Sequence, residues 1–211
     1  FLETGRLVDP EPAQRPAAFV TGEYFFERLK GYVVESEEQA GWYAHYQLGI
    51  LYFQKKDYER AEQEFQASLA EGKTAWAYHG LASLYTVTGE KGKACEAVSR
   101  GICLQPEDLS YVKEGFRLLI MNGGCERALE IWPQLDGSIR REGRMKFYYI
   151  QALAENGKNE EAYRILTENG GLRVDDIREG EISLSDMWKT LRNRLGYEDK
   201  SVPEQFDFTA I

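Results

Sequence analysis

The chain has 211 residues, of which 43% are hydrophobic and 13% aromatic, and this composition excludes a disordered polypeptide. Lys and Arg number 26 and Asp and Glu number 35, so the net charge at pH 7 is −9. Because phosphate contacts need clustered cations, this balance argues against binding to nucleic acid or to anionic membranes. No apolar run in the sequence approaches the roughly 18–20 residues that cross a bilayer.

The first residues differ in composition from the rest. Pro10, Pro12 and Pro16 are three of the six prolines in the chain. We therefore expect residues 1–20 to form a linker or an extended N-terminal segment, the alternative being an arbitrary chain end. Since the first residue is Phe1 and not Met, we also expect a piece of a longer protein. Three cysteines, an odd number, favour no disulfide framework and indicate a reducing, cytoplasmic location.

A period of about 34 residues organises the middle of the chain. Four alanines recur at spacings of 33, 34 and 34 residues, and four other columns keep the same phase. In chain order of the units, the columns are Gly49, Ala82, Phe116 and Ile150; Tyr52, Tyr85, Leu119 and Leu153; Lys56, Gly89, Gly123 and Gly157; Ala61, Ala94, Ala128 and Ala162; and Phe65, Val98, Trp132 and Leu166. Five columns in one register predict four equivalent units.

Each column has a physical reason in a pair of amphipathic helices joined by a tight turn. Glycine, present in the turn column of three units, takes a positive φ and ends the first helix. The alanine lets the two helices approach closely, and the large residue one turn later fills the space beside it. Asp57, Thr74 and Asn159 are the expected N-caps of helices that follow them.

The hydrophobic pattern predicts helices and no sheet. A leading helix over 21–34 precedes four pairs, and a final helix over about 184–196 begins at Ser183 or Ser185. The predicted pairs are 40–54 with 57–71, 74–88 with 90–104, 107–122 with 124–134, and 143–156 with 159–168.

This pattern resembles the tetratricopeptide repeat (TPR) over about residues 42–169. The second unit carries the motif most completely, as Leu81, Ala82, Tyr85, Gly89, Ala94, Val98 and Pro106. The resemblance implies an all-α, TPR-like α-solenoid, a right-handed superhelix of helix–turn–helix repeats. Its array spans 21–169 with the leading helix, in four repeats of about 42–74, 75–108, 109–142 and 143–169. Residues 170–211 then form an acidic loop, a C-terminal capping helix and a tail.

The tail has a resemblance of its own. Residues 174–188, VDDIREGEISLSDMW, and the Phe206–Asp207–Phe208 ending are similar to the C-terminal TPR region of large bacterial proteins. Those proteins carry an N-terminal domain of unknown function that is similar to sugar-binding β-sandwiches. After Phe208 the chain departs from that pattern, with Thr-Ala-Ile in place of Arg-Met. A simpler interpretation is a cap on the last repeat, formed by an apolar stripe of Met187, Trp188, Leu191 and Leu195.

No catalytic or metal-binding constellation stands out in the sequence. His45 and His79 lack the partner column of a zinc site, and we interpret the carboxylates of 175–181 as a solvated loop. Residues 67–74 match a permissive phosphate-loop pattern, but a predicted helix precedes them where that motif needs a strand. We therefore predict no enzymatic activity, no metal and no cofactor for this chain.

The TPR resemblance implies a concave groove lined by the first helix of each pair. The groove is expected to be aromatic in its first half and basic in the middle, and aromatic and Arg side chains are common interface anchors. Its partner-binding residues are predicted to be Tyr43, Tyr46, Ile50, Phe53, Trp76, His79, Lys113 and Arg117, with Phe147, Gln151 and Glu155 in the fourth unit. Alternatively, the leading helix fills the groove through Tyr24, Phe25, Phe26 and Leu29.

These features predict a non-enzymatic interaction module, a scaffold of the bacterial cytoplasm. It would dock a protein or peptide, or its own upstream domain, in the aromatic-lined groove, and would bind neither nucleic acid nor membrane. The alternative is the helical C-terminal part of a multidomain carbohydrate-binding or carbohydrate-active protein. A third hypothesis is a homodimer formed through an uncapped repeat face.

The repeat register can be tested at one alanine. Ala94→Leu should overpack the helix pair of the second unit and lower stability by about 1–3 kcal/mol. A thermal melt of the variant beside the wild type measures this effect. An unchanged melting temperature would contradict the register.

Overall fold

The computed structural model describes residues 7–16, 21–35, 40–175, 183–199 and 201–207. Within these residues all regular structure is helical and no strand occurs, which confirms the all-α prediction. The chain divides into two compact units, residues 1–106 and 107–211. The division falls close to the predicted junction between the second and third repeats.

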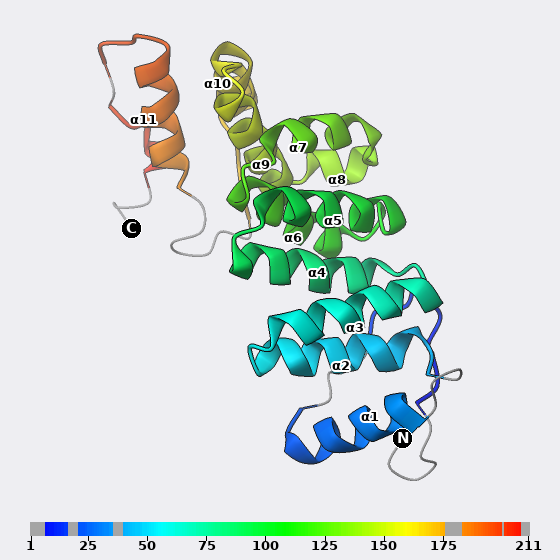
Figure 1. The fold of residues 1–211 in the computed structure, drawn as a ribbon. Coiled ribbons are helices and arrows are strands. Elements are labelled where there is room, and N and C mark those ends of the chain that lie inside the picture. The colour runs from blue at the N-terminus through cyan, green and yellow to red at the C-terminus, as the bar shows by residue number, and fades with distance from the viewer. Residues whose placement is uncertain (1–6, 17–20, 36–39, 176–182, 200, 208–211) are drawn as a thin grey trace. The chain divides into compact units, whose positions relative to one another are not determined.

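The N-terminal unit is built from two helix hairpins behind a leading helix (Figure 1). Helix α2 packs on α3, α3 on α4 and α4 on α5, while α1 packs on α2. The bounds are α1 Glu23–Glu35, α2 Trp42–Gln54, α3 Tyr58–Glu71, α4 Ala75–Thr88 and α5 Lys91–Leu104. The consecutive pairing of neighbours is that of a TPR-like solenoid.

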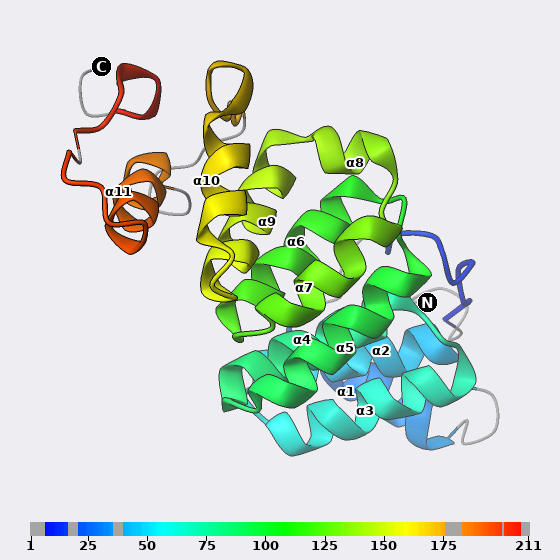
Figure 2. The ribbon, with the colours of Figure 1, turned by 90° about the horizontal axis from the view of Figure 1, so that it is seen from above.

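The C-terminal unit continues the same pairing with less regular helices. Helices α6 and α7 pack on each other and on α9, and α10 packs on both α9 and α11 (Figure 2). The bounds are α6 Leu109–Met121, α7 Cys125–Ile131, α8 Gly137–Arg141, α9 Gly143–Glu155, α10 Asn159–Thr167 and α11 Leu184–Arg194. Short 3₁₀ turns lie at Trp132–Gln134, Glu168–Gly170 and Glu204–Phe206.

The third pair departs from the prediction in its second helix. That helix was expected to reach residue 134, but α7 ends at Ile131 because Pro133 has no N–H and cannot continue an α-helix. The short helix α8 was not predicted. Its N-cap is Asp136, whose carboxylate accepts a hydrogen bond from the Ser138 N–H at 2.7 Å.

Most predicted N-caps are confirmed. Asp57 and Thr74 accept hydrogen bonds from the backbone three residues ahead, at 3.3 and 3.2 Å, and Ser183 caps α11 in the same way at 3.1 Å. The prediction for Asn159 is wrong. Lys158 occupies the N-cap position and makes no side-chain cap, so Asn159 is already the first helical residue of α10.

The alanine column lies in the packed core. Ala61, Ala94, Ala128 and Ala162 all have no exposed surface. In the N-terminal unit the ring of Phe65 lies between two helices that carry glycine at the contact. A Cβ on Gly49 of α2 would lie 2.7 Å from this ring, and one on Gly80 of α4 would lie 2.6 Å from it. Any side chain at either glycine would push the helices apart.

The leading helix packs on the end of the first hairpin. Phe26 meets the ring of Tyr52 edge-on at 5.1 Å, and Leu29 is 1% exposed. Tyr52 is one of the repeat-column residues and is not among the predicted groove residues. Tyr24, which was also expected to fill the groove, is 60% exposed. Of the four residues expected to fill the groove, Phe26 and Leu29 are buried, and the ring contact of Phe26 is with Tyr52.

Helix α11 acts as the predicted cap on α10. Leu184, Trp188 and Leu191 are buried, and the Trp188 ring lies 5.3 Å from that of Tyr163 on α10. Met187 was expected in the same stripe but is only half-buried. The acidic stretch 176–182 and the last residues, 208–211, lie outside the described part of the chain.

Lys56 occupies the turn column of the first unit, and its backbone conformation allows a test of that column. This exposed lysine stands where the other units have glycine, and its φ is 62°, against 81° at Gly89. Because a left-handed conformation costs a residue with a Cβ roughly 1–2 kcal/mol, Lys56→Gly should stabilise the chain by about 0.5–1 kcal/mol in urea unfolding. Gly89→Ala, at an open position, should destabilise it by about 1 kcal/mol. Equal stability of Lys56→Gly and wild type would contradict this account.

Candidate protein-docking surfaces

The predicted groove residues fall in both units. Tyr43, Tyr46, Ile50, Phe53, Trp76 and His79 belong to α2 and α4 of the N-terminal unit, whereas Lys113 and Arg117 lie on α6 of the C-terminal unit. Each set is therefore described within its own unit.

The aromatic residues of α2 run from the surface into the core. Tyr43 is partly exposed and stacks on Tyr46, with ring centroids 6.4 Å apart and planes 25° apart. Tyr46 in turn lies 6.2 Å from Phe65, the ring between the two glycines, and is 5% exposed. Tyr46 thus belongs to the core, and Tyr43 presents the accessible end of the cluster.

The other predicted residues of this unit divide in the same way. Ile50, Phe53 and His79 are partly exposed, and the Phe53 ring lies 5.8 Å from that of Tyr58. Trp76 is 9% exposed and belongs mainly to the core. Of the predicted groove residues in this unit, Tyr43, Ile50, Phe53 and His79 are thus the partly exposed ones.

The two cations on α6 are engaged with carboxylates of their own unit. The Arg117 guanidinium donates to both oxygens of Glu114, at 2.6 and 2.8 Å, and Lys113 lies 3.8 Å from Glu142. Both cations are partly buried. The expected basic stretch is thus largely neutralised within the chain.

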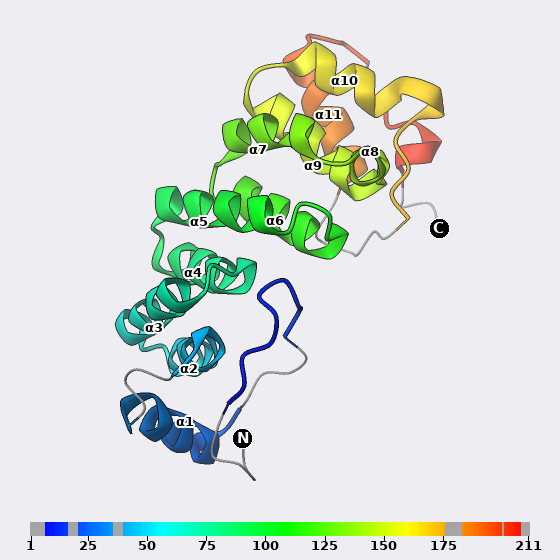
Figure 3. The ribbon, with the colours of Figure 1, turned by 90° about the vertical axis from the view of Figure 1, so that its right-hand side faces the viewer.

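An unpredicted feature is the docking of the N-terminal segment, residues 7–16, on the N-terminal unit (Figure 3). The segment has no helix or strand, and it turns at Glu11–Gln14, where the Gln14 N–H donates to the Glu11 carbonyl at 2.8 Å. The indole N–H of Trp42 donates to the Pro10 carbonyl at 3.3 Å, and the Gln105 amide donates to the Ala13 carbonyl at 2.9 Å. The segment therefore bridges the start of α2 and the end of α5.

Asp9 of this segment caps helix α2. Its Oδ1 accepts a hydrogen bond from the Tyr43 N–H at 3.0 Å, and a carboxylate is favourable at this positive end of a helix. The N-cap residue itself, Gly41, has no side chain to do so, and a Cβ there would lie 1.9 Å from the Asp9 carboxylate. The one signal in the sequence is a glycine at the N-cap, where Ser, Thr, Asp or Asn is usual.

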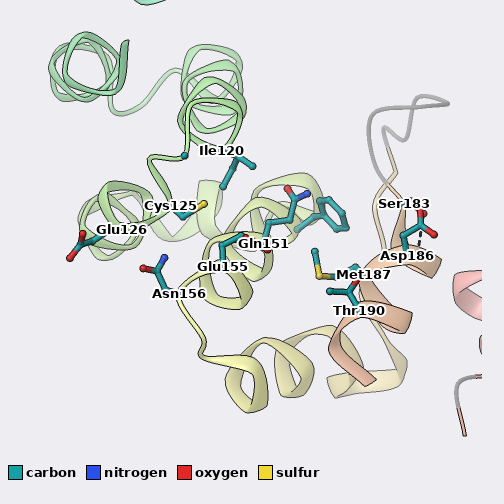
Figure 4. A pocket seen from close by; sticks show the side chains of 12 residues that line it. Ile120, Cys125, Glu126, Gln151, Glu155, Asn156, Ser183, Asp186, Met187 and Thr190 are labelled. Carbon is teal, nitrogen blue, oxygen red and sulfur yellow. Dashed lines mark hydrogen bonds between the residues drawn. The ribbon is translucent and has the colours of Figure 1, made fainter. Parts of the chain in front are cut away.

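A cleft of about 870 Å³ lies in the C-terminal unit, between α9 and α11 (Figure 4). It contains the three residues predicted for the groove of the fourth unit, Phe147, Gln151 and Glu155. Its full lining is Ile120, Gly123, Cys125, Glu126, Phe147, Gln151, Glu155, Asn156, Ser183, Asp186, Met187 and Thr190. The contribution of α11 was missed, because the sequence pattern treats that helix only as a cap.

The family model of the tetratricopeptide repeat matches residues 42–74, which contain the α2–α3 hairpin. A search of curated proteins found no match. The repeat match and the consecutive helix hairpins together support a TPR protein. In the described residues no group of three or more His, Cys, Asp or Glu side chains is placed to hold a metal ion, and none of the helices is long and apolar enough to cross a membrane.

The burial of Tyr46 predicts how stability changes at alkaline pH. Burial, with a smaller effect of Tyr43, raises the pKa of Tyr46 above its ordinary value of 10.0. The folded state therefore holds this proton more tightly than the unfolded state, and stability should fall as the pH rises above 10. Tyr46→Phe should lose less stability between neutral and alkaline pH, measured by urea unfolding, than the wild type or the exposed-site control Tyr24→Phe. An identical loss in all three proteins would contradict this assignment.

Proposed function

We propose that this chain is a non-enzymatic protein-interaction module that docks non-helical polypeptide segments on its helix hairpins. The match to a tetratricopeptide repeat at α2–α3 supports the general class. The observation that carries the proposal is the chain's own segment 7–16, a non-helical segment with a turn at Glu11–Gln14, which the N-terminal unit holds by three hydrogen bonds. We call the site that holds it, formed by Gly41, Trp42, Tyr43 and Gln105, the segment track.

The track recognises mainly the backbone of its occupant. Trp42 and Gln105 donate to main-chain carbonyls, which any non-helical segment offers. Asp9 supplies a side-chain contact to the N-terminus of α2, where Gly41 has no capping side chain. A segment with an acidic residue followed by prolines fits this arrangement, since proline has no N–H of its own to satisfy and leaves its carbonyl available.

The accessible rings provide a surface beside the track. The N–H of Tyr43 binds Asp9, and its ring belongs to the aromatic cluster of α2. Tyr43, Ile50, Phe53 and His79 would give a longer peptide, or an upstream domain, apolar contacts on α2 and α4. This is the groove role predicted from the sequence, carried by its partly exposed members.

The proposal places the module in the bacterial cytoplasm, and the three cysteines, which form no disulfide in the structure, are compatible with a reducing compartment. The alternative role, as the helical C-terminal part of a carbohydrate-binding or carbohydrate-active protein, stays a prediction. The coding sequence upstream of Phe1 is its direct check. A mass that rises with protein concentration would support the homodimer.

A peptide of residues 7–16 tests the track in trans. Asp9→Ala in the full chain should weaken the docked segment by about 1 kcal/mol, the usual value of a helix cap. A fluorescent 7–16 peptide should then bind this variant about fivefold more tightly than wild type, measured by fluorescence anisotropy. The same peptide with Asp9 replaced by Ala should lose that advantage.

Gly41→Ala is the matched control, because its Cβ fills the space that the Asp9 carboxylate needs. The double variant Asp9→Ala/Gly41→Ala should therefore bind the peptide no better than wild type. If Asp9→Ala melts cooperatively but gains no affinity for the peptide, the track is not a docking site. Binding that Gly41→Ala leaves unchanged would place the peptide elsewhere.

A further inference from the structure

The cleft of the C-terminal unit arises because α11 uses only one of its faces for packing. Leu184, Trp188 and Leu191 bury that face on α10. Met187 and Thr190 lie on the other face and line the cleft, with Gln151 of α9 across from them (Figure 4). The cap thus leaves a second helix face open to a ligand.

One contact fixes the end of α11 to the end of α9. The Arg194 guanidinium donates to the Ala154 carbonyl at 2.5 Å and pairs with Glu155 at 2.8 Å. The same Ala154 carbonyl accepts the Gly157 N–H at 3.1 Å, so Arg194 adds a second hydrogen bond at the C-terminal end of α9. Arg194 therefore holds the two walls at one end, while the lining between them remains accessible.

The charged groups of the cleft lining all have the same sign. Glu126, Glu155 and Asp186 line it, and among the described residues no Lys or Arg does. Arg194 offsets part of the charge of Glu155. With a net charge of −9 on the whole chain, the local and the overall fields both attract a cationic partner.

Between these carboxylates the cleft lining mixes polar and apolar side chains. The partly exposed side chains of Ile120 and Met187 provide its apolar surface, with the buried Phe147 ring beneath. Methionine adapts to side chains of different shape, which suits a peptide site. The amides of Gln151 and Asn156 offer both donors and acceptors to a peptide backbone.

We propose that this cleft binds an amphipathic peptide segment of a partner protein, with Lys or Arg residues beside apolar ones. An apolar side chain of the segment packs on Ile120 and Met187, and its cations lie toward Glu155 and Asp186. The inference extends the proposed function to a second site and names the chemistry of its partner. It does not depend on the segment track of the N-terminal unit.

Two short fluorescent peptides of the same amphipathic pattern, one of Leu and Lys and one of Leu and Glu, test the charge preference on the full chain. The Leu/Lys peptide should bind and the Leu/Glu peptide should not. Glu155→Gln/Asp186→Asn should weaken the Leu/Lys peptide about tenfold or more. The matched control Glu59→Gln/Glu71→Gln removes the same charge from exposed positions on α3 and should retain most of the affinity.

Thr190→Arg provides a second variant, because it places a repelling cation in the cleft while both carboxylates remain. It should also abolish binding of the Leu/Lys peptide, with circular dichroism confirming wild-type helicity. Equal losses in the cleft and α3 double variants would overturn the proposal in favour of a general charge effect. Absence of Leu/Lys binding to wild type would also overturn it, while binding of the 7–16 peptide to Asp9→Ala would still stand as the separate test of the track.

Discussion

The close approach of paired helices at four fully buried alanines is the constraint on which the fold depends. A larger side chain at Ala61 or Ala94 would separate the helices of its hairpin. The N-terminal unit adds a second close contact, where Gly49 and Gly80 leave room for the ring of Phe65 between α2 and α4. With the helices held at this spacing, α2 carries its aromatic cluster from Phe65 in the core out to Tyr43 at the surface. The accessible rings are thus positioned by the packing beneath them.

The 34-residue period predicted the features that depend on residues close together in the sequence. The bounds of α2 to α5 follow from amphipathic spacing, turn glycines and caps such as Thr74, all of which act within a few residues. The same pattern explains why Tyr46 and Trp76 were placed in the groove although both are nearly buried. On a helix that packs against neighbours on several sides, residues beside the core stripe are covered too, and spacing along one helix does not record those neighbours.

What the sequence could not predict are contacts between positions far apart in the chain. The bond between Asp9 and the Tyr43 N–H joins residues 34 positions apart, and no repeat or motif links them. A glycine at the start of a helix is compatible with many N-terminal arrangements. The sequence does not show that the Asp9 carboxylate occupies the space that a side chain at Gly41 would take. The cleft could be predicted only in part for the same reason. Its α9 side follows the repeat period, whereas its α11 side depends on which face of α11 packs on α10.

The two proposed docking sites hold their ligands by different forces, and this difference separates them in solution. At the segment track, hydrogen bonds from Trp42 and Gln105 to main-chain carbonyls involve no net charge, and Asp9 contributes an ionic term at the start of α2. At the cleft, attraction to Glu155 and Asp186 is exposed to solvent and is screened over roughly 8–10 Å at physiological ionic strength. Added salt should therefore weaken a cationic peptide at the cleft far more than a non-helical segment at the track. A partner that engaged both sites would keep its segment bound at the track as the ionic strength rises, after its basic segment has dissociated from the cleft.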